Sequence, residues 1–121
     1  MPYGVRSYRS QSKYHPFYSQ IEAMGIGDEY VAKGFDSTSI KPNWAWGTGD
    51  VRVEYQMPAG TRAFYFNAIA SSVYEHEYEL MPARGSRWQL TSKRVESNGK
   101  ITATVELVSQ PEGYAAEEGA E

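Results

Sequence analysis

Hydrophobic and polar residues alternate along much of the chain, which is the pattern of strands with one buried face. The clearest case is residues 51–57, VRVEYQM, where valines and a tyrosine fall on one side and charged or amide residues on the other. Weaker patterns predict strands over residues 3–10, 29–40, 74–81, 87–97 and 100–108, with a further strand or extended stretch over 62–70. The pattern therefore predicts a β-rich domain of about six strands.

Two segments interrupt this alternation. Phe17, Ile21 and Met24 follow the spacing of a helix face, and Pro16 stands where a helix begins, so we predict a short helix over about residues 16–24. The dipeptide Asn98-Gly99 is typical of a hairpin with a two-residue turn of a primed type.

Composition indicates one compact domain. The chain has 121 residues, of which 40% are hydrophobic and 22% charged. We predict a folded core over residues 1–109 and, from its small and acidic residues, a flexible tail over 110–121. No apolar run reaches the length of a membrane span and no signal peptide is evident, so we expect no membrane partner. We also expect a monomer.

Charge and cysteine content exclude some functions. The chain has no cysteine, which excludes a disulfide framework and a thiolate zinc site, and its two histidines show no metal-ligand spacing, so no metal is predicted. The formal charge of -3 argues against tight binding to nucleic acid. Four basic residues could still form a local patch, although a solvated strand face is the simpler interpretation: Arg84, Arg87, Lys93 and Arg94.

Three glutamates stand at every second position in residues 75–79. Side chains two apart on a strand point the same way, roughly 6 to 7 Å from one another. Glu75, Glu77 and Glu79 therefore share one purely acidic face. By itself this pattern fits either a solvated face or a site, and in an enclosed site the repulsion would raise the pKa of at least one carboxyl group.

Two further polar features lie within predicted strands: three consecutive hydroxyl residues and one arginine. Ser37, Thr38 and Ser39 follow Phe35, and each hydroxyl could simply bond to the nearby backbone. Arg9 lies in the first strand, where a lone arginine is usually a surface residue. Neither group is decisive alone.

Taken in order, however, the arginine, the Phe-x-Ser-Thr-Ser strand and the Glu-x-Glu strand resemble the mono-ADP-ribosyltransferase toxins of the Arg, Ser-Thr-Ser, Glu-x-Glu class. The stretch EYELMPARGSRW is similar to the matching piece of the clostridial binary actin-modifying toxins, with Gly85 and Ser86 at their Gly-Ser. The resemblance covers about residues 5–108. It implies an α+β, β-rich fold with two packed, mainly antiparallel sheets around an NAD cleft and few short helices.

The resemblance also implies a reaction: NAD is the substrate, its nicotinamide–ribose bond is cleaved, and ADP-ribose passes to a target. Arg9, or Arg6 in its place, then binds the diphosphate. Ser37 orients the ribose and the catalytic Glu79, which stabilises the developing cation. Glu77 removes the proton of the acceptor, and a glutamate there resembles the arginine-modifying rather than the asparagine-modifying branch.

Further site residues are carried over from the same resemblance. The NAD-binding set is Arg9, Phe35, Ser37, Thr38, Ser39, Trp44, Trp46 and Glu79. The two tryptophans suit either stacking on nicotinamide or a hydrophobic plug, and both interpretations stay open. Val73, Tyr74 and Glu75 fall in the segment that recognises the target. One departure from the family is that Pro82 precedes Ala83, where a basic residue is usual.

The resemblance also implies a biological role. We expect the catalytic core of a secreted or delivered toxin effector, of the polymorphic type, that acts in the cytoplasm of a target cell. Its partners would be a target protein, or a nucleic acid, and an immunity protein. The alternatives are an NAD glycohydrolase on the same fold, a noncatalytic β-sandwich that binds sugar through its aromatic residues, and a structural component with a decayed enzyme fold.

Overall fold

The computed structural model describes residues 4–33, 38–39, 49–66 and 79–111. Within these ranges the chain forms eight strands and one helix. In chain order they are β1 (Val5–Gln11), α1 (Pro16–Ala23), β2 (Glu29–Val31), β3 (Thr38–Ser39), β4 (Val51–Met57), β5 (Ala63–Phe66), β6 (Glu79–Pro82), β7 (Arg87–Val95) and β8 (Ile101–Ser109).

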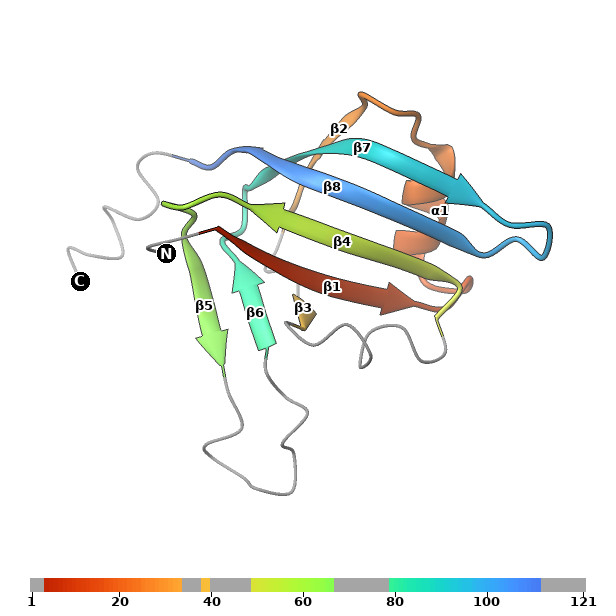
Figure 1. Cartoon of the computed structure of the whole chain (residues 1–121), viewed down its shortest axis with the longest axis horizontal. Coiled ribbons are helices and arrows are strands. Elements are labelled where there is room, and N and C mark those ends of the chain that lie inside the picture. Colours follow the sequence, from red (N-terminus) through yellow and green to blue (C-terminus); the bar gives the residue numbers. More distant parts are fainter. Residues whose placement is uncertain (1–3, 34–37, 40–48, 67–78, 112–121) are drawn as a thin grey trace, which may run out of the picture.

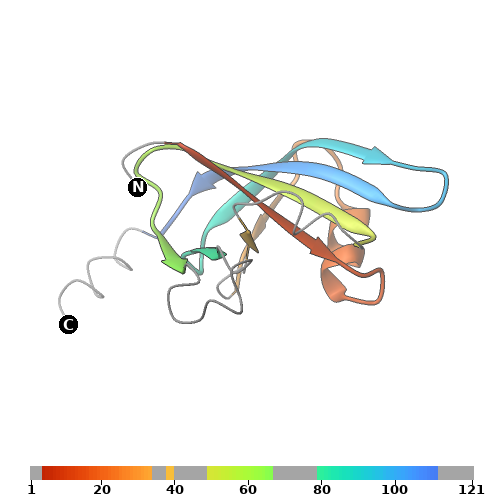
Figure 2. The same ribbon diagram turned by 60° about the horizontal axis from the view of Figure 1, so that its bottom comes forward.

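All eight strands belong to one hydrogen-bonded sheet, in the order β2-β7-β8-β4-β1-β3-β6-β5. Neighbouring strands are antiparallel except β4 and β8 at the centre, which are parallel. The sheet bends between β1 and β3, so that β3, β6 and β5 run across the direction of β1, β4 and β8 (Figures 1 and 2). The β-rich fold class is thus confirmed, and the two expected sheets are continuous with each other through the pairing of Tyr8 with Ser39.

The strand predicted over residues 29–40 is instead two strands in different parts of the sheet. β2 pairs with β7 at one edge, whereas β3 lies between β1 and β6. Directly after β2 the backbone of Ala32 still bonds to the turn before β7: its N–H donates to the Ser86 carbonyl at 2.9 Å and its carbonyl accepts from the Gly85 N–H at 2.7 Å. The alternation over residues 29–40, which predicts one strand, therefore includes residues of two separate strands.

The core lies on one face of β4 and its neighbours. The prediction for β4 is confirmed residue by residue, because Val51, Val53, Tyr55 and Met57 are buried and the residues between them are partly exposed. Across the parallel pairing, each core residue of β4 from Val51 to Tyr55 meets a small or aliphatic residue of β8. This alternation buries one side of the sheet and leaves the other polar.

The helix α1 covers the core face (Figures 1 and 2). His15 is its N-cap, and the Nδ1 atom of that ring accepts a hydrogen bond from the Phe17 N–H at 3.0 Å. Proline at the first helical position suits a helix start because its missing N–H would have no partner there. At the other end, Lys93 Nζ donates to the carbonyls of Glu22 and Met24, both at 2.7 Å. These contacts satisfy orphan groups at both ends of a helix only eight residues long.

The predicted hairpin joins β7 to β8, but its turn is not of the predicted type. The N–H of Glu96 donates to the Lys100 carbonyl at 2.8 Å, which leaves three residues in the loop rather than two. Among the described residues only glycines have positive φ. In this loop the residue with positive φ is Gly99, at 89°. A primed two-residue turn needs positive φ at Asn98 as well. The Asn98 side chain instead accepts from the Lys100 N–H at 3.0 Å, so it stabilises the longer loop.

One glycine is required by close packing at the start of β4. A Cβ atom on Gly49 would lie 1.4 Å from Ser10 Oγ, 2.8 Å from Ser10 Cβ and 3.2 Å from the Gln11 nitrogen. We expect Gly49→Ala to lower the free energy of unfolding by about 2–3 kcal/mol, since backbone and side chain must both move.

Urea denaturation measures that loss. The matched control is Gly25→Ala, because a Cβ there would meet only Asp28 Oδ2, at 3.7 Å. An equal change in both variants would contradict the close approach at Gly49.

Candidate functional site

A cleft of about 460 Å³ opens between β1, the start of α1 and the end of β2. Its lining residues are Arg9, His15, Pro16, Phe17, Gln20, Tyr30, Val31, Ala32 and Lys33. They combine two cations with aromatic rings and an amide. Such a mixture suits a ligand that carries both negative charge and flat rings.

Arg9 enters this cleft from the middle of β1. The residue pairs with Val53 in β4, so it stands on the core face, and its side chain is half-buried. The central carbon of its guanidinium lies 4.0 Å from the centroid of the Phe17 ring. The cation is therefore placed at the junction of β1 and α1.

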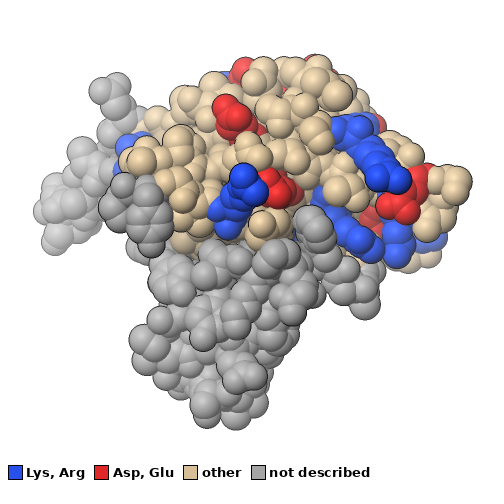
Figure 3. Space-filling model, in the orientation of Figure 1, with Lys and Arg blue, Asp and Glu red and all other residues tan. Residues whose placement is uncertain are grey.

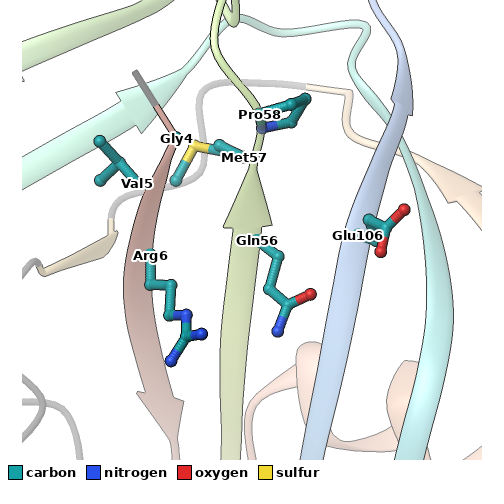
Figure 4. A pocket seen from close by; sticks show the side chains of 7 residues that line it. All are labelled: Gly4, Val5, Arg6, Gln56, Met57, Pro58 and Glu106. Atoms are coloured by element: carbon teal, nitrogen blue, oxygen red, sulfur yellow. The ribbon is translucent and has the colours of Figure 1, made fainter.

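Arg6 lies on the other face of the sheet. It lies three positions before Arg9, and an odd number of positions along a strand reverses the direction of the side chain. Its Nε atom is 3.8 Å from Glu54 Oε2, with 68% of the Arg6 side chain exposed. Figure 4 shows Arg6 beside Gln56 and Glu106, on the neighbouring strands β1, β4 and β8, where they line a hollow of about 330 Å³. Arg6 therefore does not reach the cleft that Arg9 lines.

Strand pairing places Tyr8, the neighbour of Arg9, in one row with two residues of the predicted motifs. Tyr8 pairs with Ser39, and Ser39 pairs with Glu79. Since neighbouring strands are about 4.8 Å apart, the backbone of Glu79 is roughly 10 Å from that of Tyr8. Arg9, the Ser-Thr-Ser strand and the second glutamate of Glu-x-Glu thus come from three adjacent strands, although 70 positions separate the first from the last along the chain.

Thr38 holds these three strands together from the buried side. It is 3% exposed, and its hydroxyl is 2.7 Å from Ser7 Oγ, a side chain with no exposed surface. Thr38 Oγ1 also donates to the Leu80 carbonyl. Because a hydroxyl has one proton, the Ser7 hydroxyl supplies the proton of the remaining bond. Thr38 therefore links β1, β3 and β6 through its side chain.

The Gly-Ser dipeptide forms the turn between β6 and β7. Gly85 has φ +84°, and a Cβ atom there would lie 2.6 Å from Pro111 Cγ, so only glycine fits. Ser86 is fully buried, and its hydroxyl accepts from Gln110 Nε2 at 3.0 Å. The same amide of Gln110 donates to the Arg62 carbonyl at 2.8 Å, and its oxygen accepts from the Arg62 N–H at 2.8 Å. The turn that follows the glutamate strand is thus fixed by residues 110 and 111.

Several predicted site residues lie outside the described part of the chain. They are Phe35, Ser37, Trp44, Trp46, Val73, Tyr74, Glu75 and Glu77. For Ser39 and Glu79 the structure describes the strand positions but not the side chains. Sequence reasoning treated Phe17 only as a helix residue and did not include Tyr30 or Lys33. The helical spacing of Phe17 and its place two residues after the cap were the available signals.

Two of the four basic residues considered as a patch have contacts of their own. Arg87 Nη1 is 3.5 Å from Glu29 Oε1, and Lys93 is engaged at the end of α1. Figure 3 shows acidic side chains among the basic ones on the face it presents. No three His, Asp or Glu side chains gather as a metal site among the residues with described positions. Within those same ranges, no helix is long and apolar enough to cross a membrane.

Comparison with known proteins connects this geometry to one family. The profile of a family described as ADP-ribosyltransferase exoenzyme matches residues 3–110. A search of curated proteins found no match.

Solved structures with the same fold come from bacterial proteins of this kind. C3larvin toxin, an ADP-ribosyltransferase from Paenibacillus larvae, has a TM-score of 0.69 at 19% identity, over 90% of this chain and 64% of that one. The C3 exoenzyme of Clostridium limosum has 0.70 at 17%, over 90% and 62%. C3stau2 from S. aureus, solved with NAD, has 0.70 at 18%, over 90% and 64%. The chain thus spans slightly less than two thirds of the length of these proteins.

Proposed function

Because the chain belongs to the ADP-ribosyltransferase exoenzyme family, we propose that it cleaves the nicotinamide–ribose bond of NAD and transfers ADP-ribose to a target macromolecule. The observation that carries this proposal is that Arg9, which lines a cleft, and the strands β3 and β6, the second of which begins at Glu79, are adjacent in the sheet. Those are the residues and strands to which the resemblance gives roles in the reaction, and only folding makes the strands neighbours.

Arg9 binds the diphosphate of NAD in this mechanism. A guanidinium offers several N–H donors in one plane, which match two phosphate oxygens better than a point charge does. Its place on the cleft-lining face of β1 favours Arg9 over Arg6, whose side chain pairs with Glu54 on the opposite face. The cleft of about 460 Å³ is of the size that small-molecule sites have.

Glu79 acts at the ribose. When nicotinamide leaves with the electron pair of the glycosidic bond, positive charge develops on the ribose C1′ and its ring oxygen. A carboxylate that accepts a hydrogen bond from the 2′-hydroxyl stabilises that charge more than it stabilises the ground state. Ser37 orients Glu79 and the ribose by hydrogen bonding. The Thr38 contacts keep β3 in register with β6, which supports both residues.

Glu77 completes the transfer. A nitrogen or oxygen of the target forms a bond to C1′, and the proton that it loses passes to the Glu77 carboxylate. We propose an arginine side chain as the acceptor, because a guanidinium nitrogen attacks only as its proton is removed. If water takes the acceptor's place, the products are ADP-ribose and nicotinamide, and the enzyme is a glycohydrolase.

The acceptor can be tested with a small molecule. We expect free arginine or another simple guanidine to increase nicotinamide release by the wild-type protein several-fold. Glu77→Gln should lose this increase yet retain basal hydrolysis, because only the transfer step needs the base. The measurement is nicotinamide release with and without the guanidine. Equal stimulation of both proteins would remove Glu77 from the proposed role, and stimulation of neither would argue against an arginine acceptor.

The remaining site residues and the biological role belong to the same proposal. Trp44 and Trp46 stack on or enclose the nicotinamide end, Phe35 and Ser39 contact NAD, and the target is recognised through residues 73–75, Val73, Tyr74 and Glu75. No metal takes part. We also propose a secreted or delivered toxin effector that acts in the cytoplasm of the target cell as a monomer, with an immunity protein as its antagonist. The toxins among its structural relatives support this role.

A further inference from the structure

We propose that Phe17 is a positioning residue that holds the Arg9 guanidinium where the diphosphate of NAD binds. The inference deepens the proposed function and rests on it. Phe17 belongs to none of the sequence motifs that indicate the reaction. Its role comes instead from the packing of α1 against β1.

The two side chains are in direct contact within the cleft. The Arg9 guanidinium carbon is 4.0 Å from the centroid of the Phe17 ring, well inside the range of a cation–π interaction. Both residues line the cavity of about 460 Å³. Phe17 itself is 4% exposed, so the ring is held by the core while its surface near Arg9 forms part of the cleft wall.

The ring is a fixed platform because the connection between β1 and α1 is held by hydrogen bonds. The Phe17 N–H donates to His15 Nδ1 at 3.0 Å, and the His15 N–H donates to the Ser12 carbonyl at 3.0 Å. Asp50 Oδ2 accepts from the Lys13 N–H at 2.9 Å, which ties the same connection to the start of β4. These bonds restrict where the Phe17 ring can lie.

A fixed ring lowers the entropic cost of binding an anion. An arginine side chain has several rotatable bonds, and ordering it on binding costs free energy that reduces affinity. A guanidinium donates hydrogen bonds in its own plane and contacts an aromatic ring through its face, so the two kinds of contact use different parts of the group. The Arg9 side chain can therefore pack on Phe17 and bind the diphosphate at the same time. The packing orients its guanidinium before NAD binds.

The test measures NAD binding by calorimetry in the Glu79→Gln background, where turnover does not consume the ligand. Phe17→Leu keeps an apolar side chain but removes the ring, and we expect the Kd for NAD to rise about five- to tenfold. Phe17→Trp, which retains a ring face, should restore most of the affinity. In the active protein, Phe17→Leu should raise KM for NAD by a similar factor with little change in kcat.

A control separates positioning from loss of stability. Ile21 is fully buried in the same helix and does not line the cleft. Ile21→Val should lower thermal stability and leave the Kd unchanged. If Phe17→Leu does not fold, Phe17→Met replaces it with the same expectation.

A double-mutant cycle gives the sharpest result. In an Arg9→Ala background, Phe17→Leu should not weaken NAD binding further, because the residue acts through Arg9. Additive losses would overturn the inference, as would an unchanged Kd for Phe17→Leu in the presence of Arg9. If the wild-type chain does not bind NAD at all, the proposed function fails and the inference fails with it.

Discussion

Glu79→Gln is expected to lower the rate of nicotinamide release from NAD by about a thousandfold. Glutamine has nearly the same shape as glutamate but no negative charge, so it cannot stabilise the cation that forms as nicotinamide leaves. Glu79 opens β6 and pairs with Ser39 in β3 and Phe66 in β5. The substitution changes no backbone hydrogen bond of this ladder, so the fold and the binding of NAD should persist.

The matched control for this prediction is Glu54→Gln. Glu54 is also a strand glutamate, but it lies on the polar face of β4, where its Oε2 accepts from Gln56 Nε2 at 2.9 Å and is 3.8 Å from Arg6 Nε. Glu54→Gln should leave nicotinamide release within about twofold of the wild-type rate. Comparable losses in both variants would mean that Glu79 has no special place in the reaction, provided that thermal denaturation shows both proteins folded.

Trp88→Ala is expected to have the largest effect on stability, about 3–5 kcal/mol in the free energy of unfolding. Trp88 lies in β7 with no exposed surface, and its ring meets that of Tyr55 edge-on, with the centroids 4.9 Å apart and an angle of 90° between the planes. Removing its ring leaves a cavity in the core beside Tyr55. Since small domains are stable by about 5–15 kcal/mol, much of the margin is lost. Equilibrium denaturation in urea measures this change.

Trp88→Phe sharpens that prediction. Among the described residues the indole Nε1 is buried and has no hydrogen-bond partner. Phenylalanine removes this unsatisfied N–H and keeps a ring against Tyr55, so we expect a loss of only about 1–2 kcal/mol. If phenylalanine destabilises the protein as much as alanine does, the contribution of Trp88 is not the packing described here.

Structure can be predicted from the sequence where the spacing of apolar residues matches the face of the element that the core buries. The alternation in β4 is the best case, since one face of that strand is covered by the core and the other is polar. The start of α1 was predictable for a similar reason: His15, Pro16 and the spacing of Phe17 and Ile21 all indicate the same helix. In both elements the local signal and the tertiary contact agree.

Other features depend on contacts that are distant in sequence. The turn at Asn98 and Gly99 has three residues because Glu96 and Lys100 pair across it, and the dipeptide alone did not reveal that pairing. Likewise, no local pattern shows that residues 29–40 serve different parts of the sheet. The resemblance identified Gly85, but its need for glycine comes from Pro111, which is far along the chain.

The candidate site shows the same division. The motifs identified Arg9 and Glu79. The choice between Arg9 and Arg6 required the strand register and the packing of α1, because these show that Arg9 lines the cleft and Arg6 does not. The contact between Arg9 and Phe17 joins two elements, so neither strand alternation nor helical spacing alone predicts it. The roles of Glu77 and Ser37 rest on the resemblance and stay predictions.

Transfer itself can be measured by following labelled ADP-ribose from NAD into macromolecules of bacterial and eukaryotic lysates, with wild-type protein and with Glu79→Gln. We expect a labelled target with the wild type, loss of labelling with the variant, and nicotinamide release that the lysate stimulates. The absence of labelling, of nicotinamide release and of NAD binding by the folded wild-type protein would contradict the proposed function.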